Sequence, residues 1–228
     1  MKNMFSYDSK LMSVLSFIGD LFILNVLYLL CSVPVFTIGA AQAGLHTAVR
    51  VLQDPMDGRS PVKAFFRGFK AGFGRITLAW LLFFVFDIIL YFTLYMTFTY
   101  ADTGLLIHWG VPLVGVCISL VYQTVLGLFH SQFSCTFPQL LRNCALMCVW
   151  HPLASVLSGA LMCLPMIMFL LIPAIFVQIT PLFLTVYFSL AALLIYLLTQ
   201  KAFKALIDNF NNPEDPEIKE EEKAEAAE

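Results

Sequence analysis

The chain has 228 residues, of which 60% are hydrophobic and 12% are charged, and its formal net charge at pH 7 is −2. Soluble domains carry about 25% charged residues, so this composition excludes an ordinary soluble globular domain. Windows of about 20 apolar residues, enough to cross the hydrocarbon core of a bilayer as a helix, recur along the chain. The sequence therefore predicts an integral membrane protein that crosses the bilayer several times.

The apolar stretches predict helices in a definite order. Five spans are expected, at residues 14–38, 76–97, 105–128, 153–176 and 180–199. A transmembrane barrel would need alternating strands of about 10 residues, and apolar runs such as 161–176 do not alternate. The predicted fold class is all-α: a polytopic transmembrane helical bundle of about five spans, with amphipathic helices at the cytoplasmic interface.

The first span contains Pro34, and the small residues Gly39 and Gly44 follow it. A single unbroken helix over residues 14–52 would be about 60 Å long, roughly twice what a bilayer needs. The sequence thus predicts a helix break at Pro34 followed by a close packing face. A substrate site of the broken-helix type is the alternative, although no second half of the chain repeats the pattern.

A basic segment lies between the first two spans, where Ser60 and Pro61 are suited to start a helix. Three phenylalanines recur every four residues, and basic residues lie roughly opposite them; these residues are Arg59, Lys63, Phe65, Arg67, Phe69, Lys70 and Phe73. Such a helix would be amphipathic and basic. It could lie at the membrane surface beside anionic lipid headgroups, or it could dock its phenylalanine face on the protein's own spans or on a partner.

The distribution of basic residues predicts the orientation, because Lys and Arg in short loops are retained on the cytoplasmic side. The loop after the first span holds Arg50, Arg59, Lys63, Arg67, Lys70 and Arg75, and Lys201 and Lys204 follow the last span. The short loop around Asp102 has no base. We predict a multi-pass protein of the cell membrane, with its N-terminus outside and its C-terminus in the cytoplasm. Lys2 and Lys10 disagree with that orientation.

Polar residues inside the spans are the candidate functional residues. Asp87 lies near the middle of the second span, where an ionised carboxylate costs about 2.5 to 3.5 kcal/mol on an insertion scale. It could form a structural hydrogen bond with Gln123 or Tyr122 of the third span, or it could line a solute path. Asp20 and Asn25 of the first span are the other candidates for an intramembrane polar site.

The cysteines offer one possible metal set. Cys144, Cys148 and His151 would share one face of a helix, and Cys135 precedes them, so three thiolates and an imidazole could hold zinc. The paired short spacings of structural zinc modules are absent, and an interfacial helix over residues 138–150 explains the same residues. We expect no metal, no cofactor and no catalytic residue, and hence no enzyme.

The last sixteen residues, 213–228, hold eight acidic residues and two lysines. They have almost no apolar surface to bury, so the sequence predicts a disordered acidic tail that follows a membrane domain over residues 1–212.

Several runs resemble the signature of the YesL-like bacterial membrane proteins: Cys31-Ser32-Val33-Pro34, Thr37-Ile38-Gly39-Ala40-Ala41, Leu45-His46-Thr47-Ala48 and Phe65-Phe66-Arg67-Gly68-Phe69-Lys70. The resemblance covers residues 5 to about 210. It implies a small multi-helix membrane protein of unassigned biochemistry, often encoded beside sugar-uptake transporters. On that basis we expect a non-catalytic accessory or regulatory subunit of a membrane transport complex for carbohydrate uptake, with lipid and the transporter as partners and no nucleic acid. The alternative is a small-solute transporter or permease with Asp87 in its pathway.

Overall fold

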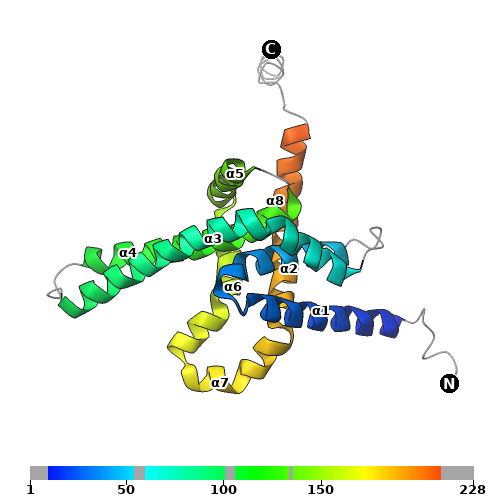
Figure 1. Cartoon of the computed structure of the whole chain (residues 1–228), viewed down its shortest axis with the longest axis horizontal. Coiled ribbons are helices and arrows are strands. Elements are labelled where there is room, and N and C mark those ends of the chain that lie inside the picture. The colour runs from blue at the N-terminus through cyan, green and yellow to red at the C-terminus, as the bar shows by residue number, and fades with distance from the viewer. Residues whose placement is uncertain (1–9, 54–59, 101–105, 134–135, 212–228) are drawn as a thin grey trace, which may run out of the picture. The chain divides into compact units, whose positions relative to one another are not determined.

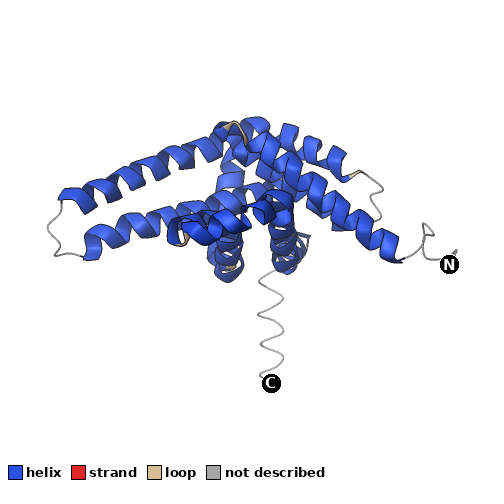
Figure 2. Ribbon diagram, turned by 90° about the horizontal axis from the view of Figure 1, so that it is seen from below, coloured by secondary structure: helices blue, strands red, loops and turns tan. Residues whose placement is uncertain are grey.

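The computed structural model describes residues 10–53, 60–100, 106–133 and 136–211, so Arg59 and the predicted tail lie outside the described residues (Figure 1). Every regular element in the described ranges is helical (Figure 2). The elements are α1 (Lys10–Ser32), a 3-10 turn η1 (Val35–Thr37), α2 (Ile38–Gln53), α3 (Pro61–Tyr100), α4 (Leu106–Gln132), α5 (Phe137–Trp150), α6 (Pro152–Leu171), α7 (Pro173–Leu182), a π-helical turn η3 (Phe183–Tyr187) and α8 (Phe188–Asn211).

Four of the described helical stretches are long and apolar enough to cross a membrane: Met12–Ser32, Pro61–Thr97, Gly110–Gln132 and Pro173–Gln200. Helices α5 and α6 are together long and apolar enough to count as a fifth. Because they are bent by 107°, this fifth span would be a broken one. The predicted all-α polytopic bundle of about five spans is therefore confirmed. By its contacts the chain divides into two compact units, Met1–Tyr196 and Leu197–Glu228, and every contact described below lies within the first unit.

The first span ends earlier than expected, at Ser32 instead of residue 38. Pro34 adopts an extended conformation there, and the Thr37 hydroxyl lies 2.6 Å from the carbonyl oxygens of both Cys31 and Pro34. Thr37 thereby satisfies carbonyl groups that the interrupted helix leaves without a partner. The chain then turns back, and α2 starts at Ile38.

Helix α2 is the most enclosed element, with twelve buried residues among its sixteen. It packs against α1, α3 and α4. Its glycines allow α3 to approach closely: a Cβ atom at Gly39 would lie 2.7 Å from Cβ of Trp80, and one at Gly44 would lie 2.9 Å from the carbonyl oxygen of Phe65. Gly39 and Gly44 therefore lie at the helix crossing, because only a residue without a side chain fits there.

The basic segment is not a separate helix, since α3 continues without interruption from Pro61 through the second expected span to Tyr100. Phe65 is fully buried and Phe69 is half-buried; both contact the core between α1 and α2, and their rings stack 6.4 Å apart. Phe73 is 43% exposed. Most of the phenylalanine face is therefore docked on the protein's own helices, one of the two arrangements that the sequence allowed.

The break between the last two expected spans lies at Ile172, next to Pro173, and not near residue 178. From Pro173 the chain stays helical through α7, η3 and α8. The π-helical turn shifts the backbone hydrogen-bonding pattern within the last span, and Asn25 forms its hydrogen bonds at this turn.

Candidate functional site

Asn25 of α1 is fully buried against the π-helical turn η3. Its Nδ2 donates to the carbonyl oxygens of Leu184 at 2.7 Å and Phe183 at 3.4 Å. Its Oδ1 accepts from the backbone N–H groups of Phe188 at 2.9 Å and Ser189 at 3.2 Å. The side chain thus supplies a donor for carbonyl groups and an acceptor for N–H groups of the backbone at the π-helical turn. Asn25 joins the first span to the last.

Asp87 lies at the contact between α3 and α4. Gln123 Nε2 donates to Asp87 Oδ2 at 2.6 Å and also contacts Ser119 Oγ at 3.3 Å. Gln123 is buried, and the second carboxylate oxygen, Oδ1, is buried without a hydrogen-bond partner among the described residues. Tyr122, the other partner that the sequence offered, donates instead to the carbonyl oxygen of Leu141 in α5. The structure therefore brings Asp87 and Gln123 together in a helix contact.

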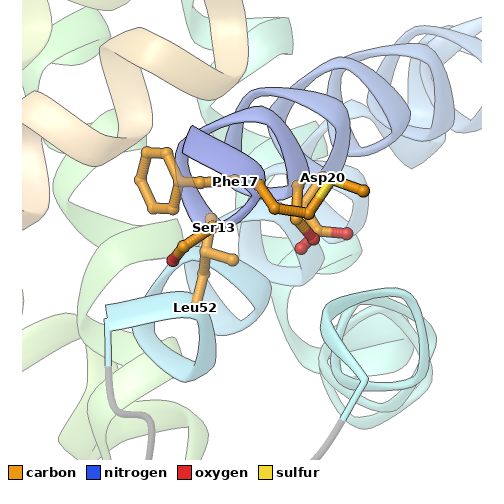
Figure 3. Close-up of a pocket in the computed structure, with 6 residues that line it drawn as sticks. Ser13, Phe17, Asp20 and Leu52 are labelled. Atoms are coloured by element: carbon orange, nitrogen blue, oxygen red, sulfur yellow. The ribbon is translucent and has the colours of Figure 1, made fainter. Parts of the chain in front are cut away.

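Asp20 lies apart from Asn25 and Asp87, in an open cavity of about 390 Å³ near the start of α1 (Figure 3). Met12, Ser13, Ser16, Phe17 and Leu52 complete its lining. Figure 3 shows Leu52 of α2 beside Ser13 of α1, with the Phe17 ring directed away from Asp20. The end of α2 therefore lies next to the start of α1, so the two helices form an antiparallel hairpin.

His46 is a buried polar residue that the sequence did not single out as a site. It lies in α2, is 1% exposed, and neither ring nitrogen has a hydrogen-bond partner among the described residues. Burial lowers its pKa to about 4, so the imidazole is neutral at physiological pH. The only signal in the sequence was that the polar His46 follows closely on the small residues between Gly39 and Gly44.

The cysteine and histidine set is only partly described, because Cys135 lies outside the described residues. Cys144 is buried and Cys148 is half-buried. In the described ranges no three His, Cys, Asp or Glu side chains are grouped closely enough to hold a metal ion. Cys148 instead lines, with Cys117, an apolar cavity of about 270 Å³ beside the bend between α5 and α6.

The fold and its polar contacts define a polytopic all-helical membrane protein whose intramembrane polar residues connect helices. Residues 21–94, from within α1 to within α3, match the family model described as "Protein of unknown function, DUF624". This similarity covers the second half of α1, all of α2 and the glycine crossing with α3. No curated protein and no solved structure matches the chain.

Proposed function

We propose that the protein is a non-catalytic accessory subunit of a membrane transport complex, one that serves carbohydrate uptake. The observation that carries the proposal is the use of the intramembrane polar groups: Asn25 and Gln123 both hydrogen-bond to other helices, and Asp87 accepts from Gln123. A transport pathway would instead present such groups to a water-filled cavity. The resemblance to the YesL-like proteins, which are often encoded beside sugar-uptake transporters, supports the choice of partner.

The experiment is purification of the tagged full chain from its native membrane in a mild detergent. We expect the membrane domain of a sugar transporter to be recovered in about equal molar amount, as measured by quantitative mass spectrometry. A matched sample that carries the tag on an unrelated multi-pass protein controls for carry-over. Recovery of the chain alone, together with solute flux in vesicles that contain only this chain, would contradict the proposal.

A small-solute permease remains the second candidate, and one observation favours it. Asp87 Oδ1 is buried without a hydrogen-bond partner among the described residues, so this oxygen is available to a proton or a cation.

We also propose an orientation in the cell membrane that differs from the expected one at the N-terminus. The basic segment and the C-terminus are cytoplasmic, in agreement with the distribution of Lys and Arg. Because α2 returns along α1, we count the two helices as a hairpin that passes through the membrane in both directions, so the start of α1 is on the same side as the basic segment. With α2 added to the five spans the number of passes is even, and the N-terminus is cytoplasmic too. This orientation also explains Lys2 and Lys10, which disagreed with an external N-terminus.

Reporter fusions test this orientation. We expect reporters fused before residue 10, within residues 53–60 and after Lys204 to read as cytoplasmic, because each site lies beside basic residues. A reporter at Asp102 should read as external. An external reading before residue 10 combined with a cytoplasmic reading at 53–60 would contradict the α1–α2 hairpin as the arrangement in the membrane.

A further inference from the structure

The first half of α3 carries an exposed positive face. Lys63, Arg67 and Lys70 are all exposed, and their spacing of four and three residues places them on one side of the helix. No acidic residue occurs in α2, or in α3 before Asp87. Neither this part of α3 nor α2, which packs against it, therefore supplies an acidic residue to balance the positive charge of the face.

The opposite side of the same helix is fixed by close packing. Phe65 is fully buried, and Gly68 faces α2 so closely that a Cβ atom there would lie 2.5 Å from Thr47 Oγ1. This contact shows which side of α3 faces α2, and so which side is left exposed. Phe66 and Phe73, which are 42% and 43% exposed, flank the basic side chains. The exposed face thus combines positive charge with aromatic surface, as membrane-interface helices do.

Helix length places this face at the membrane surface. The 40 residues of α3 extend about 60 Å, whereas the hydrocarbon core is about 30 Å thick, so part of the helix must lie beyond the core. The candidate span Pro61–Thr97 is longer than the core requires, and the three basic residues of this face lie in its first ten positions. At 1.5 Å per residue, Lys70 and Arg67 lie roughly 9 and 14 Å before Ile76, where the span expected from the sequence begins, and Lys63 lies one further turn away. Long basic side chains at such positions extend toward lipid headgroups.

We propose that this face, formed by Lys63, Arg67 and Lys70 with Phe66 and Phe73, binds the phosphate groups of anionic phospholipids. The charge complements the phosphates, and the two phenylalanines contact the upper acyl chains. A soluble anion would gain nothing from the exposed aromatic rings. The inference rests on the proposed cytoplasmic placement of this segment but not on the accessory role, and the reporter fusions test that placement separately.

The experiment measures lipid binding to the full chain purified in a neutral detergent. Short-chain phosphatidylglycerol is titrated against phosphatidylcholine with the same acyl chains, and the shift of the thermal unfolding midpoint gives each affinity. We expect tighter binding of phosphatidylglycerol that weakens as salt rises. The variant with Lys63→Gln, Arg67→Gln and Lys70→Gln should bind it about 100-fold more weakly, since each base adds roughly a fivefold gain near an anionic surface.

The control variant removes three bases elsewhere, through Arg142→Gln, Lys201→Gln and Lys204→Gln, and should keep the affinity. A variant with Lys63→Arg and Lys70→Arg should also keep it, because the charge is retained. If the triple glutamine variant does not fold, Lys70→Gln alone should weaken binding about fivefold.

Four results would overturn the proposal. Equal binding of both lipids by the unaltered chain would remove the role of charge, and full affinity in the glutamine variants would place the binding elsewhere. Glycerol phosphate as effective as the lipid would make a free phosphate the ligand. A peptide of residues 213–228 that displaces the lipid at equal concentration would make an acidic peptide the occupant.

Discussion

Replacing Asn25 with leucine is expected to destabilise the protein by about 4 kcal/mol, one of the largest effects of any single substitution. Asn25 makes four hydrogen bonds to the backbone around η3. Leucine has a similar volume but neither donates nor accepts, so two carbonyl and two N–H groups lose Asn25 as a hydrogen-bond partner in the buried interior. Each buried backbone group left unpaired costs about 1 to 3 kcal/mol, and part of that cost is recovered by local rearrangement.

The measurement is unfolding of the full chain in mixed micelles, followed by circular dichroism. Thr93→Val provides the control, because Thr93 is exposed and its hydroxyl bonds only within its own helix, to the carbonyl oxygen of Ile89 at 2.9 Å. Asn25→Asp should be intermediate, since a carboxylate can still accept from the N–H groups of Phe188 and Ser189 but cannot donate. Equal stability of Asn25→Leu and Thr93→Val would show that η3 does not depend on Asn25.

Much of the helical architecture could be predicted because it follows from local patterns. Apolar length identified the spans, and Pro34 followed by small residues indicated the end of α1. The contact between Asp87 and Gln123 was one that the sequence offered, because few polar side chains occur in those two spans and each needs a partner in lipid.

The α1–α2 hairpin was not predicted, because hydropathy describes a helix only by its own residues. Gln42, His46 and Arg50 make α2 too polar to resemble a span, so the sequence predicts only a helix break at Pro34 and a packing face at Gly39 and Gly44 in this region. The helix is instead enclosed by α1, α3 and α4, so Gln42 and His46 are buried within the protein. Recognising this would require knowing which helices pack together.

The π-helical turn was also missed, for a related reason. Apart from Thr185, residues 183–187 are apolar or aromatic like their neighbours, and no local residue indicates a changed backbone pattern. The partner that accommodates the turn, Asn25, lies more than 150 residues away in the chain, as the hydrogen bond from Asn25 to Leu184 shows. Long-range contacts of this kind cannot be read from a window of sequence.

Substitutions of Asp87 distinguish an accessory subunit from a permease. Leucine and asparagine at this position are expected to have different effects on stability. Asp87→Leu leaves the buried Nε2 of Gln123 without its carboxylate acceptor, and it should destabilise the protein by about 1 to 3 kcal/mol. Asp87→Asn keeps the shape and an acceptor oxygen, so its stability should stay close to that of the unaltered chain. Unfolding in mixed micelles measures both effects.

The double variant with Asp87→Leu and Gln123→Leu should recover most of the stability lost in Asp87→Leu, because no donor is then left unpaired. Under the accessory proposal, Asp87→Asn should also retain the transporter during purification, since the helix contact is preserved. If Asp87 carried protons or bound a cation, the unaltered chain alone would support solute-dependent flux in vesicles. That flux would vanish in Asp87→Asn although the protein still folds, and such a result would replace the accessory subunit with a permease.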